Sequence, residues 1–159
     1  MRFVGLRLLV RSLAVLGVAL LVGSCGLVTR TQRLFGGTLP LDVVVSAGAN
    51  RTSPVAVALL VVYDSKLGEK LQSLTARAWF EQHQQFKRDY PRDFDAWSWE
   101  WVPGQDVAHQ QLAYRSGARL VLVFADYLTA GAHRLALDPH KHWRLVLGDA
   151  TLTAEEVKE

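Results

Sequence analysis

Two stretches of the chain are apolar at almost every position, which predicts strands that are buried on both faces. They cover residues 55–63 (VAVALLVVY) and residues 118–127 (ARLVLVFADY). Apolar runs of this length, bounded by turn residues, are typical of central strands. Further strand candidates, shorter or less apolar, cover residues 41–46, 107–114, 143–147 and 151–157. We expect residues 41–46 and 55–63 to form an antiparallel pair joined by a turn-rich loop.

Another predicted strand, residues 97–102, alternates in polarity, so that Trp97, Trp99 and Trp101 share one face. This stripe has two interpretations. Indole rings can stack on sugars at a glycan-binding surface, or they can fill a core in which each N–H finds an internal acceptor. We favour the core, because the other strongly apolar strands are few and a core must be filled.

One amphipathic helix is predicted between the two apolar runs. Ser73 or Thr75 can cap its first turn, and Pro91 ends it. Its stripe at helical spacing consists of Ala76, Trp79, Phe80, His83 and Lys87. Residues 67–74 are expected to add an earlier turn to the same helix. Short strands with one inserted helix predict a mainly β protein, a β-sandwich.

The N-terminal residues have the anatomy of an export signal. Arg2, Arg7 and Arg11 precede an apolar run at residues 13–22, which is too short to span a bilayer as a helix. The run ends in Leu21-Val22-Gly23-Ser24-Cys25, which resembles the lipobox of bacterial lipoproteins. This resemblance implies a signal peptide at residues 1–24.

Cys25, the only cysteine, would then become the acylated first residue of the mature chain. The next residue is Gly26 and not the aspartate that retains enterobacterial lipoproteins in the inner membrane. The resemblance therefore implies a lipid-anchored protein on the periplasmic face of the outer membrane. We divide the mature chain into an acylated tether at residues 25–40 and a β-sandwich domain at residues 41–159.

The charge balance excludes one class of partner. Three of the 18 Lys and Arg residues lie in the leader, so that 15 basic residues balance 15 Asp and Glu residues in the mature chain. The basic character of the whole chain therefore belongs to export, and nucleic-acid binding is not expected. The mature length of 135 residues allows one domain with a substantial core.

No group of residues predicts catalysis or a cofactor. His140-Lys141-His142, with Asp138 nearby, resembles part of a zinc site, but such a site needs three or four ligands. We interpret this segment as a polar loop before a strand, so no metal site is predicted. His83 is interpreted as a half-buried packing residue, and His109 has no evident partner. We expect a protein that is not an enzyme.

A series of short motifs follows the lipobox. It comprises Asn50 in a loop, residues 54–63 (PVAVALLVVY), Ala78-Trp79-Phe80, Trp101-Val102-Pro103-Gly104, residues 118–127 and Trp143-Arg144. In this order the motifs resemble the type VI secretion outer-membrane lipoprotein family, known as TssJ, VasD or SciN. The resemblance covers nearly all of the mature domain.

The resemblance implies a two-sheet, transthyretin-like β-sandwich with a short helical insertion. It also implies an anchor for the trans-envelope secretion complex, which binds the periplasmic domain of the inner-membrane protein TssM, itself paired with TssL. In the family the loop between the first two strands contributes to this contact. Here it maps onto Ala47, Gly48, Ala49, Asn50, Arg51, Thr52 and Ser53.

Asn50 and Arg51 offer the best hydrogen-bonding side chains of this loop. Two alternatives stay open. The protein could be a lipoprotein that binds peptidoglycan through the Trp stripe, or a pilotin-like accessory lipoprotein of another secretion system.

Overall fold

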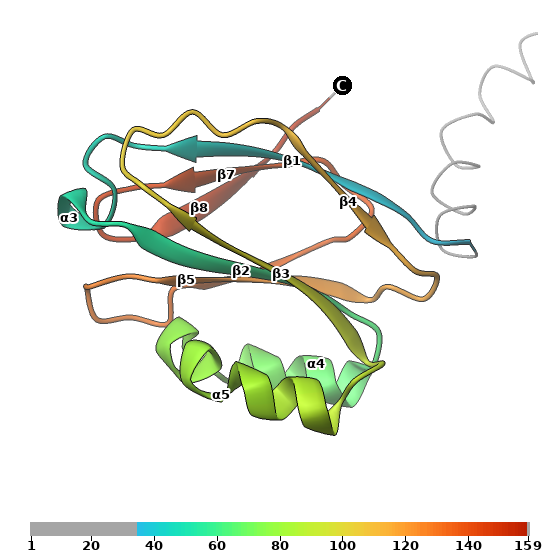
Figure 1. Ribbon diagram of the computed structural model, residues 1–159. Helices are drawn as coiled ribbons and strands as arrows, with labels where there is room; N and C mark the ends of the chain where they lie inside the picture. Colours follow the sequence, from blue (N-terminus) through green and yellow to red (C-terminus); the bar gives the residue numbers. More distant parts are fainter. Residues whose placement is uncertain (1–34, 159) are drawn as a thin grey trace, which may run out of the picture.

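The computed structural model describes residues 35–158 (Figure 1). The predicted signal peptide at residues 1–24, the predicted lipidation site Cys25 and residues 26–34 of the predicted tether lie outside this range.

Two four-stranded sheets pack face to face, as predicted for a β-sandwich (Figure 1). Sheet A has the order β4-β1-β7-β8, with the strands β1 (Gly37–Val45), β4 (Gln110–Tyr114), β7 (Trp143–Leu147) and β8 (Leu152–Glu156). Sheet B has the order β3-β2-β5-β6, with the strands β2 (Val55–Val62), β3 (Phe94–Trp101), β5 (Leu120–Asp126) and β6 (Arg134–Leu137). All neighbouring strands are antiparallel except β1 and β7, which are parallel.

The apolar character of β2 at every position has a structural reason. Val57, Leu59 and Val61 point towards sheet A and join the core between the sheets. Leu60 and Val62 point to the opposite face and join a second core beneath the helices. The prediction of a strand buried on both faces is confirmed.

Two helices, α4 (Ser65–Gln72) and α5 (Ala76–Asp89), cover the outer face of sheet B (Figure 1). Trp79 of α5 is buried and stacks on Phe124 of β5, with ring centroids 5.5 Å apart. The hydroxyl of Thr75 accepts a hydrogen bond from the Ala78 N–H at 3.1 Å, which confirms this predicted cap. Among residues 35–158, no helix has the length and apolarity that a membrane crossing requires.

The single predicted helix is in fact two. Asp64 caps α4 separately by accepting a hydrogen bond from the Leu67 N–H, and a short break at residues 73–75 precedes α5. On α5 the inward stripe ends with Phe86, whereas Lys87 is exposed. His83 is half-buried beside Trp79, as interpreted from the sequence.

The predicted boundary between tether and domain at residue 40 is too late. β1 begins at Gly37, and Leu39 is fully buried in the core. Pro40 does not interrupt the strand. β7 pairs with β1 only from Leu41 onwards, so one side of β1 is unpaired at the proline, which has no N–H to donate.

The predicted antiparallel pairing of the first two strands is also wrong. β1 lies in sheet A between β4 and β7, and β2 lies in sheet B between β3 and β5. The segment that joins them crosses from one sheet to the other. The short strand β6 was not predicted, because four residues are too few to show a strand pattern.

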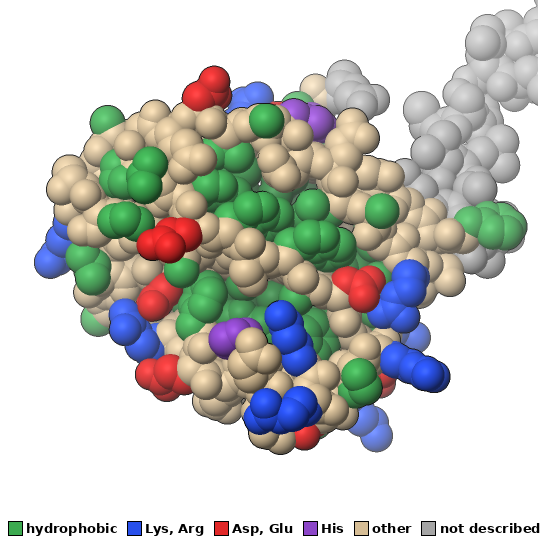
Figure 2. All heavy atoms as spheres, in the orientation of Figure 1, with side chains coloured by type: hydrophobic (Ala, Val, Ile, Leu, Met, Phe, Trp, Pro, Cys, Tyr) green, Lys and Arg blue, Asp and Glu red, His purple; other side chains and the backbone are tan. Residues whose placement is uncertain are grey.

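The Trp stripe faces the core, but unevenly. Trp101 is 3% exposed, whereas Trp97 and Trp99 are half-buried and pack against the same core. Figure 2 shows hydrophobic side chains in a band across this side of the molecule, between the two sheets. The core interpretation is therefore confirmed fully for Trp101 and in part for the other two.

We expect Trp101→Ala to lower the free energy of unfolding by about 3–5 kcal/mol, because the change removes a buried indole and leaves a cavity. Urea denaturation followed by circular dichroism measures this loss. Ser98→Ala, at an exposed position of the same strand, is the control and should leave the midpoint unchanged. An unchanged midpoint for Trp101→Ala would show that the indole is not part of the core.

Candidate partner-binding site

The loop between β1 and β2 lies at one end of the sandwich, far from the start of β1 (Figure 1). The nine residues of β1 separate the two ends by about 26 Å. The same end carries the loops that follow β3, β5 and β7. We call this end the loop pole and define it as residues 46–54, 102–106, 127–133 and 148–151.

The β1–β2 loop contains a left-handed turn, α3 (Ala49–Thr52). Asn50, Arg51 and Thr52 have φ values of 48°, 55° and 60°. Residues other than glycine rarely adopt this region, which costs roughly 1–2 kcal/mol per residue. Such a conformation persists only where surrounding contacts enforce it.

Asn50 makes most of the hydrogen bonds that hold the turn in this conformation. Its side chain is 2% exposed, donates to the Pro54 carbonyl at 2.8 Å and accepts from the Leu128 N–H at 2.7 Å. The backbone N–H groups of Asn50 and Arg51 donate to the carbonyls of Gly148 and Asp149. The turn is therefore fixed both to its own β2 end and to two neighbouring loops.

The structure divides the seven predicted contact residues. Ala47, Gly48, Arg51 and Thr52 are exposed, and Ser53 is half-buried. Ala49 and Asn50 are buried, so neither side chain can face a partner. The expectation that Asn50 offers its amide to a partner is wrong, because that amide is used within the fold.

Two apolar residues of the neighbouring loops are exposed at the loop pole. Val102 is 50% exposed and Leu128 is 61% exposed. The Val102 loop is tied to the β1–β2 loop, since the Gly104 N–H donates to the Ser46 carbonyl at 3.2 Å. Leu128 is tied to it through its own N–H and Asn50. This grouping could not be predicted from the sequence, because it depends on which strands end at the same pole.

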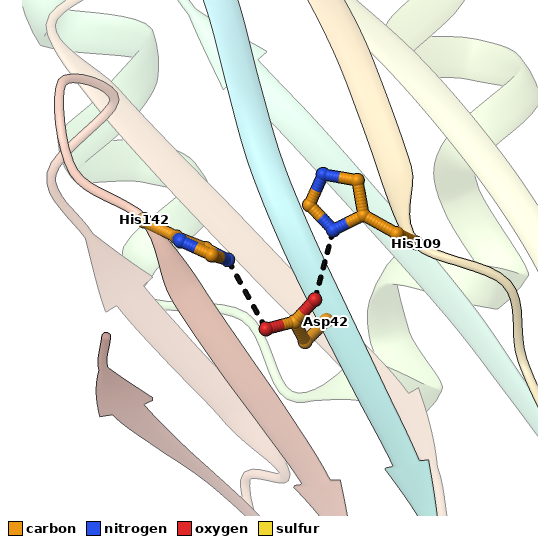
Figure 3. Close-up of side chains that lie close together, drawn as sticks. All are labelled: Asp42, His109 and His142. Atoms are coloured by element: carbon orange, nitrogen blue, oxygen red, sulfur yellow. Dashed lines mark hydrogen bonds and ion pairs between the residues drawn. The ribbon is translucent and has the colours of Figure 1, made fainter. Parts of the chain in front are cut away.

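A second cluster lies on the outer face of sheet A (Figure 3). Asp42 of β1 accepts hydrogen bonds from His109 Nδ1 at 2.8 Å and from His142 Nε2 at 3.1 Å. His109 comes just before β4, and His142 comes just before β7. The hydrogen bond from His109 is the largest of the effects that hold the pKa of the Asp42 carboxyl below its usual value. Burial opposes it, and the proximity of His142, His109 and Arg144 lowers the pKa further.

This cluster was missed because its members are far apart in sequence. His142 was considered with His140 and Asp138, but His140 Nδ1 lies 3.1 Å from the Tyr114 hydroxyl. The parallel pairing of β1 with β7 places Asp42 opposite Arg144, and therefore near His142. The only available signal was the unassigned His109, and the sequence could not locate its partner.

Comparisons with known proteins support the architecture. Neither a scan against protein-family models nor a search of curated proteins found a match. Among solved structures, Serratia marcescens Lip, a membrane-bound component of the type VI secretion system, matches with a TM-score of 0.57 at 15% identity, over 77% of this chain and 97% of Lip. The T6SS lipoprotein TssJ1 from Pseudomonas aeruginosa matches with a TM-score of 0.54 at 14% identity, over 77% of this chain and 95% of TssJ1. The chain has the fold of these type VI secretion lipoproteins.

Two further matches come from structures of other type VI secretion components. A chain in the structure of the T6SS protein TssM C-terminal domain (869–1107) from EAEC gives a TM-score of 0.59 at 20% identity, over 76% of this chain and 99% of that chain. A chain in a type VI membrane complex gives 0.58 at 20% identity, over 74% and 96%. The predicted two-sheet sandwich with a helical insertion is confirmed.

We expect Asn50→Ala to destabilise the domain by about 2–4 kcal/mol, since it leaves buried polar groups unpaired and places alanine in a left-handed conformation. Asn50→Gly loses the same hydrogen bonds but not the left-handed strain, so it should cost about 1–2 kcal/mol less. Urea denaturation of the three proteins separates the two contributions. Equal stability of Asn50→Ala and the unchanged protein would contradict a structural role for this side chain.

Proposed function

We propose that the protein is the outer-membrane lipoprotein of a type VI secretion system. In this proposal a lipid on Cys25 holds the chain at the periplasmic face of the outer membrane. The loop pole binds the periplasmic domain of a TssM-like inner-membrane protein, which shares the complex with TssL. The observation that carries the proposal is a rigid, exposed loop pole on a sandwich with the fold of type VI secretion lipoproteins.

The direction of β1 supports this arrangement. Any tether on the N-terminal side enters the domain at Gly37, and β1 then runs towards the loop pole. A lipid at Cys25 would be separated from β1 by residues 26–36, which reach at most about 40 Å when extended. The loop pole would then face away from the outer membrane and into the periplasm.

The surface of the loop pole suits a protein partner. Arg51 and Thr52 project from a turn that is already fixed, so that binding costs little further ordering. Leu128 and Val102 add exposed apolar surface on neighbouring loops. An apolar centre with polar groups around it is the usual composition of a specific interface.

The burial of Trp101 weighs against the peptidoglycan alternative, since a buried indole cannot stack on a sugar. Trp97 still reaches the surface, in a shallow groove that it lines with Tyr90, Pro91 and Lys87. The proposed role is non-enzymatic: the domain holds a partner in place and performs no reaction.

We expect Cys25→Ser to release the protein from the outer membrane without unfolding it, because the lipid is the proposed anchor and Cys25 precedes the domain. Membrane fractionation with immunoblotting measures the distribution, and the circular dichroism of the released protein checks its fold. Retention of the variant in the outer membrane would refute lipid anchoring at this residue.

We expect Leu128→Asp and Arg51→Glu each to weaken binding to the TssM-like periplasmic domain by at least about 10-fold, since the first places a charge on the apolar centre of the proposed contact and the second reverses a charge beside it. Isothermal titration calorimetry measures the affinity. Lys66→Glu reverses an exposed charge on α4, away from the loop pole, and should bind normally. If both test variants bind like the control, the contact lies elsewhere on the domain.

A further inference from the structure

We propose that Asp42, His109 and His142 form a site for a divalent transition-metal ion, with zinc as the ion of choice. One ligand atom from each residue lies within 4.8 Å of the other two. The residues come from β1, from the irregular segment before β4 and from the residue before β7, so the fold itself brings them together. This site is separate from the loop pole and does not depend on the proposed secretion role.

The donor set selects the class of ion. Two imidazoles and one carboxylate suit zinc and its neighbours among the divalent transition metals, whereas magnesium and calcium prefer oxygen ligands throughout. Zinc sites with three protein ligands commonly take water as the fourth. His109 is 41% exposed, which leaves the cluster open on one side for that water.

The distances are close to those that zinc requires. With bonds of about 2.0–2.1 Å, tetrahedral ligand atoms lie about 3.3 Å apart. His109 Nδ1 and His142 Nε2 are already 2.8 Å and 3.1 Å from the two oxygens of Asp42. The ligand nitrogens of the two histidines lie within 4.8 Å of each other, so they would have to approach to about 3.3 Å on binding, and the 41% exposed His109 side chain has room to move.

The hydrogen bonds of the metal-free cluster do not prevent binding. In the metal-free cluster each imidazole donates an N–H to Asp42. A neutral imidazole carries a single N–H and can move it to its other ring nitrogen, which leaves a lone pair for the ion. The proton count of the two rings then stays the same. Asp42 already holds its two oxygens between the rings (Figure 3).

One cation competes for the same carboxylate. Arg144 Nη2 lies 3.8 Å from Asp42 Oδ2, on the outer face of β7. Its side chain is 45% exposed and its contact with Asp42 is long, so it can turn into solvent when an ion binds. Asp42 itself is 30% exposed, which spares the site a large desolvation cost.

A bound ion would tie the irregular segment 102–109 to the middle of sheet A. Without it, this segment is held near β1 by the isolated bridge between Val44 and Asp106, by the bond from the Gly104 N–H to Ser46 and by the hydrogen bond from His109 to Asp42. The ion would replace this exposed hydrogen bond with coordinate bonds and would join His109 to His142 as well. It would thereby stiffen the flank of the loop pole that carries Val102.

The test uses the full chain, extracted from membranes in mild detergent and purified without a histidine tag. Zinc binding is measured by titration calorimetry and by metal analysis after dialysis, and we expect one ion per chain. His109→Ala and His142→Ala should each weaken binding by at least about 10-fold, since even partners outside the first coordination sphere change affinity by 10–100-fold. His140→Ala is the matched control, because His140 is close in sequence and bonds to Tyr114 instead.

Two further measurements distinguish a built site from loose surface binding. Co²⁺ in place of zinc should give the strong visible absorption of a four-coordinate ion, and this absorption should be lost in His109→Ala. Zinc at about 100 times its dissociation constant should raise the melting temperature of the unchanged protein by roughly 10 °C, and the same zinc concentration should raise that of His109→Ala by at most about half as much. A Cys25→Ser chain that binds equally well would show that no thiol contributes.

Less than one ion per chain, equal affinity in His109→Ala and the unchanged protein, or the same loss in His140→Ala would each overturn the proposal.

Discussion

The structure depends on keeping both faces of β2 and β5 away from water. Val57 and Leu59 need a cover on one side, and Leu60 and Phe124 need one on the other. Exposure of a single side chain of this size costs about 1.5–3 kcal/mol, so neither face can be left open. Sheet A covers the inner face and α4 with α5 cover the outer face, which makes the helical insertion a structural layer of the fold. No disulfide can assist within the chain, because it has a single cysteine.

This layering forces the chain to cross between sheets immediately after β1. The crossing must place β2 in sheet B within the few residues that follow Val45. A left-handed turn reverses the chain in little space, and Asn50 offsets its cost with two buried hydrogen bonds. The same contacts fix the backbone of Arg51 at the surface. The left-handed turn that the fold requires therefore also preorganises the proposed binding surface.

The sequence predicted local features well and long-range ones poorly. Residues 143–147 were predicted with their observed bounds, and residues 55–63 were recognised as a central strand, since both depend on the pattern within one segment. Pairing depends on segments far apart, and the assumption that consecutive strands pair placed β1 beside β2. For the same reason a sequence pattern could indicate that Asn50 is polar and lies in a loop, but not that its partners are Pro54 and Leu128. The Asp42 cluster spans 100 residues and left no local pattern at all.

The parallel pairing of β1 with β7 links the two sites. Because the strands run the same way, their ends meet at the loop pole, where the N–H of Asn50 reaches the carbonyl of Gly148. The same register brings Asp42 beside the start of β7, within reach of His142. A slip of one residue would turn Asp42 into the core, since successive side chains of a strand point to opposite faces. It would also separate the turn from residues 148 and 149. The buried alternation of Leu39, Leu41, Val43 and Val45 opposes that slip, so the core of sheet A fixes the geometry of both the binding loop and the histidine cluster.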